Sequence, residues 1–220
     1  MKTRLPEDMH LAMLERAKRS RSFFFRLRKA WQILRKDEIY GLKWGDPENC
    51  PPLRYVRDHF LLPYITPDAT VVEIGPGGGR WTRYMLAARR IYAVDAYPEL
   101  LEELKRHFDL PNITFIHNNK TDFPGIADQS VDFIFTFGVF VHLEVEVIDE
   151  YLKNMKRIIR PDGNIVIQYS DKRKPLAQQN PGFTNNSPEI MRRLAQKWGY
   201  HILEEDTLTL WHSAIIRLRP

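Results

Sequence analysis

Cysteine is almost absent from this chain of 220 residues, which contains only Cys50. A single cysteine cannot form a disulfide within the chain, in agreement with a reducing compartment. Zinc sites built on several thiolates are excluded for the same reason, and no two histidines have the His-x-x-x-His spacing. The sequence offers no base that would activate Cys50, so we expect this thiol to be inert.

Long hydrophobic runs are also lacking. The run Val131–Leu143 is among the longest, but it contains Asp132 and His142. It is shorter than the stretch of about 18 residues that a transmembrane helix needs. The N-terminal residues have neither the unbroken apolar core nor the small-residue cleavage site of a secretory signal. We therefore expect no transmembrane span and a cytoplasmic location.

Acidic residues are scarce near the N-terminus. Residues 1–44 contain twelve Lys and Arg against five Asp and Glu, a surplus of seven, whereas the whole chain has a formal charge of +5. The basic character therefore belongs to the N-terminal part. Such a surplus favours an anionic partner, such as a membrane surface, a nucleic acid or a phosphorylated substrate, although a solvated helix face is the commoner explanation.

Two kinds of hydrophobic pattern divide the chain. Residues 6–38 have apolar side chains at intervals of three and four, which predicts a basic helical extension. Residues 40–52 are rich in turn formers and predict a loop, and residues 53–64 predict a short helix. We divide the chain into an N-terminal extension with a lid loop, residues 1–52, and a main domain, residues 53–220.

From Thr70 onward, short β-branched runs alternate with amphipathic stretches, a pattern typical of β-α-β units. Strands are predicted at Thr70–Ile74, Ile91–Val94, Ile113–His117, Val131–Phe137 and Asn164–Tyr169, with helices between them. Ser187 and Gly199 mark the two ends of a late helix, and the remaining residues predict an antiparallel hairpin. The expected fold class is α/β: a Rossmann-like, doubly wound, mostly parallel seven-stranded sheet with an antiparallel C-terminal hairpin and an N-terminal helical extension.

A glycine-rich turn, EIGPGGG at Glu73–Gly79, follows the first strand. Glycine lets the backbone approach a ligand closely, and ligands of open α/β sheets bind beyond the carboxyl ends of the strands. Asp95 follows Gly75 by twenty positions, the spacing at which a carboxylate reaches the hydroxyls of a ribose. Arg80 stands where a dinucleotide fingerprint has glycine, and Glu73 suits a cationic amino group better than a diphosphate. We therefore favour a cofactor made of a nucleoside and an amino acid.

Five segments in order make the sequence resemble the class I S-adenosylmethionine-dependent methyltransferases, from about Leu53 to the C-terminus. VVEIGPGGGRW is similar to their first motif, YAVDAYPELLEEL to the acidic end of their second strand, and NNKTDFP to the segment that holds the adenine. SVDFIFTFGVFVHL is similar to their fourth strand, and LKNMKRIIRPDGNIVIQ to the helix, turn and fifth strand that follow. The resemblance implies S-adenosylmethionine as the cofactor and S-adenosylhomocysteine as the product.

The resemblance also implies a set of cofactor-binding residues: Glu73, Gly75, Pro76, Gly77, Asp95, Ala96, Asp122, Phe123 and Phe137. The two glycines would pass beneath the methionine part, Glu73 would hold its ammonium group, and Asp95 would hold the ribose. Asp122 would bind the adenine amino group with Phe123 beside it, and Phe137 would face the sulfonium. The alternatives are a strand-end acid for Asp95, a turn former for Asp122 and a core residue for Phe137.

Candidates for the acceptor side follow the fourth and fifth strands. His142 is the candidate general base, because an imidazole can take a proton from an alcohol near neutral pH and sugar O-methyltransferases of the resembling family often carry histidine here. Its alternative is a capping or surface histidine. Asp171 is a candidate to orient His142, or else a solvated loop acid. Tyr169 and Trp44 are candidate substrate-binding residues, although Tyr169 is nearly as well explained by core packing. Residues 171–186 predict an irregular substrate loop in which Lys172, Arg173 and Lys174 could meet an anion.

These observations predict a metal-independent O-methyltransferase acting on a sugar, a glycan precursor or a small polar metabolite. No carboxylate cluster for a hard cation can be assembled. No Pro-Pro-Tyr or Pro-Pro-Trp follows the fourth strand, which disfavours DNA base methylation. The alternatives are methylation of lipid or RNA through the basic N-terminal helix, with nucleic acid the less favoured, and a non-catalytic protein that binds S-adenosylmethionine. The N-terminal helix is also a candidate homodimer surface.

Overall fold

The computed structural model describes residues 39–220. The predicted helical extension over residues 6–38, and with it the candidate homodimer surface, lies outside the described residues. The predicted loop at residues 40–52 lies within them and contains a single 3-10 turn at Leu42–Trp44.

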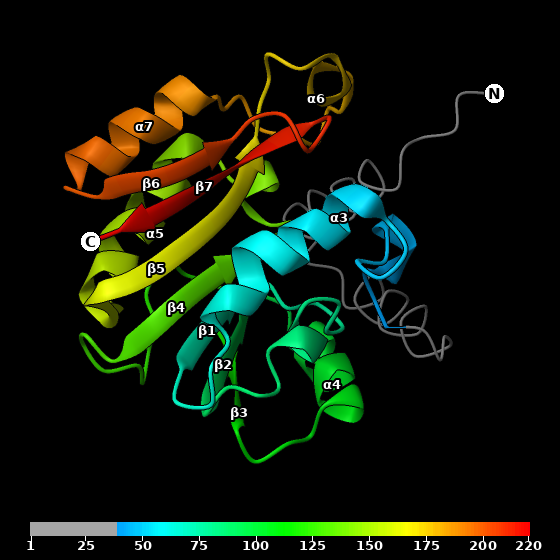
Figure 1. Cartoon of the computed structure of the whole chain (residues 1–220), viewed down its shortest axis with the longest axis vertical. Coiled ribbons are helices and arrows are strands. Elements are labelled where there is room, and N and C mark those ends of the chain that lie inside the picture. Colours follow the sequence, from blue (N-terminus) through cyan, green and yellow to red (C-terminus); the bar gives the residue numbers. More distant parts are fainter. Residues whose placement is uncertain (1–38) are drawn as a thin grey trace.

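Seven strands form one mixed sheet (Figure 1). They are β1 (Thr70–Ile74), β2 (Arg90–Asp95), β3 (Ile113–His117), β4 (Val131–Thr136), β5 (Ile159–Ser170), β6 (His201–Asp206) and β7 (Ser213–Arg219). Their order across the sheet is β3-β2-β1-β4-β5-β7-β6. The first five are parallel neighbours, and β7 pairs antiparallel with both β5 and β6. The predicted fold class is confirmed, including the antiparallel C-terminal hairpin.

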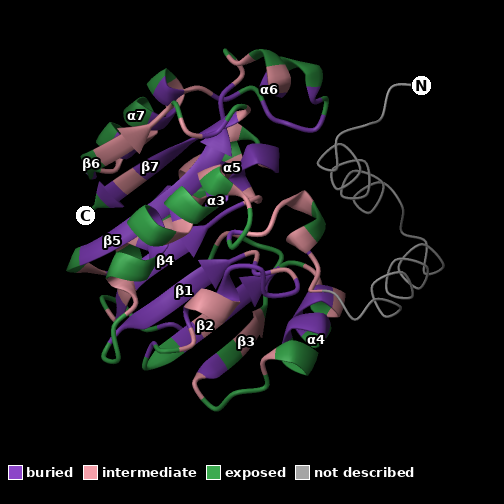
Figure 2. Cartoon of the chain, turned by 45° about the vertical axis from the view of Figure 1, so that its right-hand side comes forward, coloured by how far each residue is buried: buried purple, intermediate pink, exposed green. Residues whose placement is uncertain are grey.

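The central strands are covered on both faces. All five residues of β1 are buried, and Figure 2 shows β1, β4 and β5 as mostly buried strands in the middle of the sheet. Strands that are covered on both sides have near-continuous hydrophobic runs instead of alternation. This explains why the sequence pattern located these strands to within a few residues but could not assign their faces.

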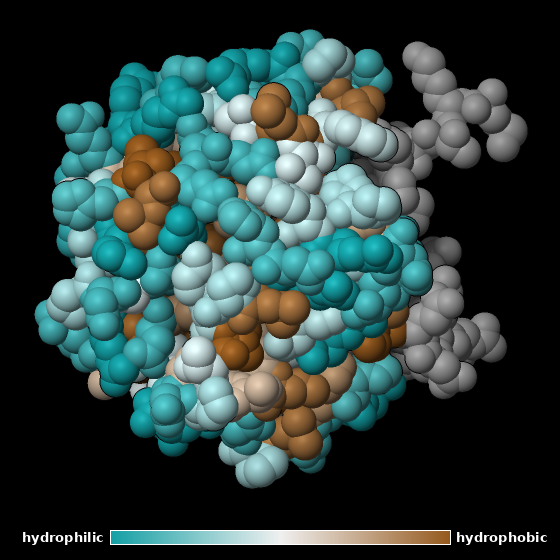
Figure 3. Space-filling model, in the orientation of Figure 1, coloured by the Kyte–Doolittle hydropathy of each residue, from teal (hydrophilic) through white to brown (hydrophobic). Residues whose placement is uncertain are grey.

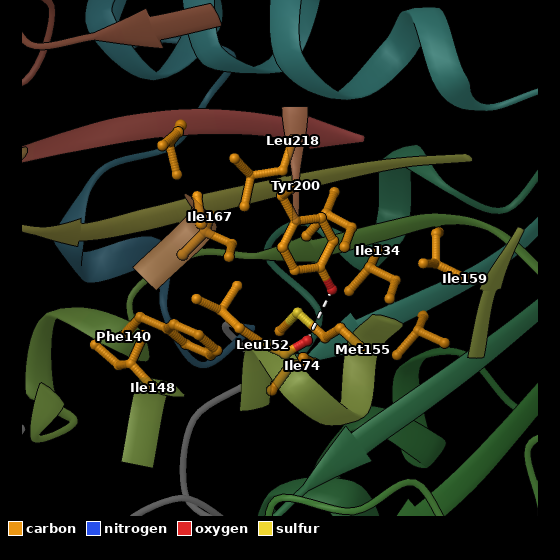
Figure 4. Packing of buried hydrophobic residues seen from close by; sticks show 14 of the residues in the cluster. Ile74, Ile134, Phe140, Ile148, Leu152, Met155, Ile159, Ile167, Tyr200 and Leu218 are labelled. Atoms are coloured by element: carbon orange, nitrogen blue, oxygen red, sulfur yellow. Dashed lines mark hydrogen bonds between the residues drawn. The ribbon is translucent and has the colours of Figure 1, made fainter. Parts of the chain in front are cut away.

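Helices α5 (Val145–Ile158) and α7 (Pro188–Lys197) pack on one face of the sheet, where their apolar sides join one cluster with residues of β4, β5 and β7. Figure 4 shows Leu152 and Met155 of α5 in this cluster, with the hydroxyl of Tyr200 donating to the carbonyl oxygen of Leu152 at 2.8 Å. The Ser187 side chain accepts from the N–H of Ile190, which confirms Ser187 as the N-cap of α7.

The opposite face is covered by the helical segment of residues 51–64 and by α4 (Pro98–His107). That segment consists of α3 (Pro51–Tyr55), a π-helical stretch (Val56–Leu61) and a 3-10 turn (Leu62–Tyr64), and Figure 1 shows it crossing in front of the sheet. A short helix was predicted over nearly the same residues.

Two of the helices predicted between strands are absent from the described structure. The connection from β1 to β2 contains only a 3-10 turn, Thr82–Tyr84, and residues 118–130 between β3 and β4 contain no helix. Gly75, Gly77 and Gly79 have φ angles of 71°, 57° and 103°, which a right-handed helix cannot accommodate. Trp81 and Met85 are buried on the sheet in place of a regular helix.

The loop predicted to be irregular between β5 and α7 is more ordered than expected. It contains the short helix α6 (Pro175–Gln179), and Ala177 and Phe183 form a small buried cluster with Val141. The N–H of Thr184 donates to the carbonyl oxygen of Val141, so the loop is tied to the segment after β4. This loop therefore forms a fixed wall beside the end of β4.

The face of the molecule in Figure 3 is mainly hydrophilic, with its hydrophobic residues in small separate groups. Leu208 and Trp211, in the turn between β6 and β7, are the most exposed of the large hydrophobic residues in the described part, at 87% and 72%. Among residues 39–220, no helix is long and apolar enough to cross a membrane.

Candidate active site at the carboxyl edge of the sheet

A cavity of about 410 Å³ opens at the edge where the parallel strands end. Its walls come from the turn after β1, the end of β2, the segment after β3, residues 137–144 after β4, residues 40–44 and the loop before β7. Residues far apart in the sequence meet here because the carboxyl ends of parallel strands share one edge. The cavity is therefore the candidate binding site.

The turn after β1 forms the floor of the cavity with Gly75, Pro76 and Gly77. The N–H of Gly75 donates to the carbonyl oxygen of Val94 at 2.8 Å, which joins this turn to β2. A Cβ atom on Gly75 would lie 2.1 Å from Cγ2 of Val139. Glycine is needed here both for its positive φ and for the close approach of the segment after β4.

Asp95 ends β2 at the cavity wall, and Ala96 follows it there. One carboxylate oxygen of Asp95 accepts from the N–H of Tyr97 at 2.9 Å, and the other lies 3.3 Å from the N–H of Gly77. Asp95 is only 6% exposed. These two backbone donors help to fix the carboxylate in the wall of the cavity, and a carboxylate is a hydrogen-bond acceptor.

The segment after β3 contributes Asn118, Asn119, Lys120 and Thr121 to the cavity. Asp122 and Phe123, the predicted adenine contacts, are not part of its lining. Asp122 bonds to the side-chain amide of Asn118, and Phe123 is buried in the core beside α5. The chain turns inward before Asp122, so the residues of this segment that line the cavity are the four before it.

Glu73 lies beneath the glycine turn and outside the cavity lining. It is 2% exposed, and its carboxyl group accepts from the hydroxyl of Thr82 at 2.6 Å. Burial raises the pKa of Glu73 to about 8, although the hydrogen bond from Thr82 acts in the opposite direction. Glu73 does not reach the cavity in this structure, and its contact with an ammonium group stays a prediction. Its buried carboxyl group instead ties β1 to the segment after the turn.

Aromatic side chains form the wall around the end of β4. Phe137 and Trp44 both line the cavity, as does Trp81, whose ring centroid lies 4.7 Å from that of Phe137. Phe137 also packs in the core, which was the alternative explanation of this residue, and its contact with the sulfonium stays a prediction. An aromatic wall of this kind can pack against a ring or an apolar part of a ligand.

His142 lines the cavity in a 3-10 turn, Phe140–His142, and is 7% exposed. Its Nδ1 atom lies 3.1 Å from the carbonyl oxygen of Gly182, and its ring packs edge-on against Phe183. The loop after β5 therefore orients this imidazole. Asp171 does not, because its carboxylate is paired with Arg173, with Nε–Oδ1 and Nη2–Oδ2 distances of 2.9 and 3.0 Å. The predicted pairing of Asp171 with His142 is wrong.

Tyr169 also differs from its predicted role. Its side chain is fully buried on the α5 and α7 face of the sheet, and its hydroxyl donates to Glu205 at 2.9 Å. Its neighbour Gln168 points the other way: Gln168 accepts from the N–H of Gly138 at 2.6 Å and donates to Ser213 at 2.7 Å. Tyr169 is therefore a core residue, and Gln168 supports the cavity wall.

The basic residues of the same loop have structural partners. Lys172 donates to the carbonyl oxygens of Ala177 and Asn180, and Lys174 donates to those of Leu210 and Ser213. Arg173 bridges Asp171 and Glu189. The sequence suggested an anion site here, but these three cations instead hold the loop in place.

The cavity residues that the sequence did not predict include Tyr40, Arg80 and His212. His212 precedes β7 and contacts Phe183 on the side opposite to His142, with a centroid distance of 5.2 Å. Burial, with a smaller contribution from the nearby charge of Lys174, lowers the pKa of His212 to about 4, so its imidazole is neutral at physiological pH. Burial raises the pKa of the Tyr40 phenol, which stays protonated. No local sequence signal links these residues, because they meet only in the fold.

Metal binding has no obvious location in the described structure. Within residues 39–220, no three His, Cys, Asp or Glu side chains gather in an arrangement that could hold a metal ion. The arrangement instead offers a carboxylate, backbone turns and an aromatic wall, which is the chemistry of a site for a nucleoside and an organic acceptor.

A parallel sheet with a glycine turn after its first strand and an acid at the end of its second defines a nucleoside-binding α/β protein. Residues 71–163 match a family model described as a methyltransferase domain. The fold is the Rossmann-like α/β fold of methyltransferases, and the matched segment runs from β1 into β5.

Curated relatives agree with this assignment. An uncharacterised methyltransferase of Schizosaccharomyces pombe is 28% identical over 135 residues, which cover 60% of this chain and 50% of the relative. A second protein of that yeast, described as methyltransferase-like, is 28% identical over 120 residues, covering 54% of this chain and 43% of the relative. The chain thus spans about half the length of the curated relatives it matches.

Solved structures share the fold at low sequence identity. The complex of DhpI with SAH superposes with a TM-score of 0.64 and 20% identity, covering 90% of this chain and 93% of DhpI. A SAM-dependent methyltransferase from Aquifex aeolicus gives a TM-score of 0.59 and 18% identity, covering 86% and 97%. A methyltransferase solved with the Trm112 activator of Haloferax volcanii gives 0.62 and 16%, covering 75% and 88%. At these identities the likeness concerns the fold.

Proposed function

We propose that this chain is a metal-independent methyltransferase that binds S-adenosylmethionine in the cavity and methylates a hydroxyl group of a sugar, a glycan precursor or a small polar metabolite. The observation that carries the proposal is the position of His142. It shares one cavity with the glycine turn and Asp95, and its ring is oriented by the carbonyl oxygen of Gly182. In this proposal residues 53–220 form the catalytic domain.

S-adenosylmethionine fits a cavity that has the glycine turn as its floor and Asp95 in its wall. Gly75 and Gly77 would lie beneath the methionine part, and Asp95 would accept hydrogen bonds from the ribose hydroxyls. Ala96 and residues 118–121 would enclose the adenine, and Phe137 would border the sulfonium. When bound, S-adenosylmethionine supplies an electrophilic methyl group, so the protein's own contribution is to align the acceptor and to receive its proton.

His142 suits the role of proton acceptor through its tautomer. A hydrogen on Nδ1 donates to the carbonyl oxygen of Gly182, and this leaves Nε2 with a lone pair. A hydroxyl group placed against Nε2 would give up its proton as its oxygen bonds to the methyl carbon. Because His142 is buried, little water competes for the same position.

The acceptor class is inferred from the walls. Trp44, Trp81 and Phe137 offer flat apolar surfaces, whereas His142 and His212 offer polar atoms between them. A compact molecule with a ring and several hydroxyl groups matches that mixture. We also expect the protein to act in the cytoplasm, which agrees with its single cysteine.

Two alternatives remain from the sequence. A lipid or RNA acceptor is motivated by the basic residues before Trp44, and a non-catalytic role by the general independence of fold and function. A protein partner is a third candidate, because one structure of similar fold was solved with the Trm112 activator. The acceptor that the purified chain methylates would distinguish these alternatives. A protein partner would be recognised if methylation required its presence.

A methyl-transfer screen tests the proposal. The full chain and S-adenosylmethionine are incubated with nucleotide sugars, glycosides, phospholipid vesicles and RNA, and S-adenosylhomocysteine is quantified. Release that depends on a hydroxylated small molecule supports the proposal, and release only with vesicles or RNA favours the lipid or RNA alternative. Binding of S-adenosylmethionine without turnover on any acceptor would favour the non-catalytic role, whereas absence of binding would refute the cofactor assignment itself.

A further inference from the structure

Trp81 brings a buried hydrogen-bond donor to the wall of the cavity. Its side chain lines the cavity, the residue is 3% exposed, and within residues 39–220 its Nε1 atom is buried without a hydrogen-bond partner. Most buried polar groups in proteins are hydrogen-bonded, because a donor that leaves water without gaining a partner costs free energy. An indole N–H can only donate, so its partner must be an atom with a lone pair.

The ring of Trp81 is held from several sides. Its centroid lies 4.7 Å from that of Phe137 and 5.4 Å from that of Phe135. The guanidinium carbon of Arg80 lies 5.5 Å from the same centroid. These contacts need an aromatic ring at this position but not its N–H, because a phenylalanine ring has the same kind of face without a polar atom. Packing therefore explains the ring and leaves the donor unexplained.

Trp198 shows the usual arrangement of an indole in this protein. It directly follows α7, does not line the cavity, and donates from Nε1 to Asp149 at 2.7 Å. Trp81 differs from it in both respects, since it lines the cavity and none of the described residues accepts its hydrogen. A molecule bound in the cavity can therefore supply the lone pair.

The neighbours of Trp81 belong to the acceptor side of the proposed reaction. Phe137, which packs against Trp81, is proposed to border the sulfonium, and His142 follows it by five residues. His142 is proposed to take the proton from the hydroxyl that is methylated. A hydrogen bond donated to that same oxygen would occupy a lone pair and stabilise the ground state, which slows the transfer. A second oxygen of the acceptor is therefore the better partner for the indole.

We propose that the indole N–H of Trp81 donates a hydrogen bond to a second oxygen of the acceptor, a hydroxyl or ether oxygen that is not methylated. The inference rests on the proposed function and deepens it, because it restricts the acceptor to compact molecules with at least two oxygen atoms, such as sugars and other polyols. A simple monoalcohol would leave the donor unpaired. Sites with a buried polar group reject such analogues more strongly than apolar pockets do.

The experiment removes the oxygens of the acceptor one at a time. The probes are the nucleotide sugar or glycoside that the full chain methylates fastest in the screen, its monodeoxy analogues and its carbasugar, which lacks the ring oxygen. The wild type is expected to lose about 10- to 100-fold in kcat/KM with one of these analogues. Trp81→Phe should lose a similar factor with the parent compound and nothing more with that analogue, because both changes remove the same hydrogen bond.

Two controls isolate the N–H. Trp198→Phe also removes an indole N–H, but outside the cavity, and should treat every analogue as the wild type does. Incorporation of 3-benzothienylalanine at position 81 keeps both fused rings and replaces the N–H by sulfur. It should behave as Trp81→Phe does, and it is the test variant if Trp81→Phe does not fold. All three proteins should bind S-adenosylhomocysteine with wild-type affinity in calorimetry, because the proposed contact does not involve the cofactor.

Three results would overturn the inference about Trp81. One is wild-type turnover that does not respond to the loss of any oxygen. Another is a Trp81→Phe protein that keeps the wild-type preference among the analogues, which would make Trp81 a structural residue. The third is weaker binding of S-adenosylhomocysteine by the benzothienylalanine protein, which would assign the donor to the cofactor. In all three the wild type still methylates a sugar compound, whereas a wild type that methylates none refutes the proposed acceptor class and this inference with it.

Discussion

The Nδ1 atom of His142 lies 3.1 Å from the carbonyl oxygen of Gly182, which is 40 residues later in the chain. This contact joins the end of β4 to the loop after β5, and it selects the tautomer in which Nε2 can accept a proton. The catalytic proposal therefore depends on the loop of residues 171–186, which the sequence predicted as a substrate loop and not as the support of His142.

Replacing His142 tests its role as the base. We expect His142→Ala to reduce turnover by about two orders of magnitude or more, the usual contribution of general base catalysis, while the affinity for S-adenosylhomocysteine stays near that of the wild type. His201→Ala, on exposed β6, is the control histidine and should behave as the wild type. Unchanged turnover in His142→Ala would make His142 a structural residue.

Asp95 should matter for binding and not for the chemical step. Asp95→Ala removes the carboxylate from the wall, and we expect a loss of about tenfold or more in affinity for S-adenosylhomocysteine, because hydrogen bonds to a charged group are among the stronger ones. Calorimetry measures the change, with Asp109→Asn, which is exposed, as the control. Wild-type affinity in Asp95→Ala would contradict the ribose assignment.

Gly75 allows the turn after β1 and the segment after β4 to meet. Gly75→Ala adds a Cβ atom 2.1 Å from Cγ2 of Val139 at a φ of 71°. We expect a loss of stability and of cofactor affinity, with an unfavourable backbone contribution of about 1–2 kcal/mol plus the steric clash. Gly125→Ala, at a φ of 76° with nothing within 4 Å, carries the backbone contribution alone. Gly75→Ala is expected to lose more stability than Gly125→Ala, and the double variant Gly75→Ala with Val139→Ala should regain part of this extra loss. If the double variant regains none of it, the steric clash is not its cause.

Glu73 makes stability fall as the pH rises. Its pKa is about 8 in the folded state against a reference value of 4.5, so the folded state holds this proton more tightly. The stabilisation is complete below pH 4.5 and is lost toward pH 8, on the order of 4 kcal/mol over the window. Glu73→Gln should remove this slope, melt at a higher temperature than the wild type at pH 7.5 and keep the affinity for S-adenosylhomocysteine. A large loss of that affinity would restore the ammonium role.

His212 makes stability fall as the pH falls, whereas Glu73 makes it fall as the pH rises. Its pKa is about 4 when folded against a reference value of 6.5, so the unfolded state binds the proton more readily. The stabilisation is complete above pH 6.5 and is lost as the pH falls toward 4, on the order of 2 kcal/mol because the ring is only partly buried. Melting of His212→Gln across pH 4–7 should show a shallower acid-side decline than the wild type. An identical profile would show that His212 does not titrate in this window.

The sequence was most informative where the chemistry is local. The glycine turn and Asp95 were predicted because positive φ angles and strand-end acids depend on neighbouring residues, and the strands were located from their β-branched runs. Tyr169 was given a role in the cavity because it ends β5, and β5 is buried on both sides, so that the end of a strand alone does not separate the core face from the cavity face. Asp122 was placed in the cavity because the motif gives a segment and not the direction of each side chain.

The features that the sequence did not predict mostly involve residues that are far apart in the chain and come together only in the fold. Arg80 and His212 border one cavity from positions 132 residues apart, and no spacing rule connects them. The helix expected after the glycine turn did not form, because three positive φ angles interrupt that segment. Asp171 was paired with the wrong partner because Arg173, two residues away, competes more effectively for its carboxylate than a histidine from another strand.

The antiparallel course of β7 places its first residue, Ser213, beside the last residue of β5, Ser170. The wall that carries His212 therefore depends on the seventh strand of the sheet, more than one hundred residues after Asp95. The nucleoside side of the cavity is built from the neighbouring strands β1 and β2, whereas the side that would receive an acceptor needs contacts between residues much farther apart in the sequence.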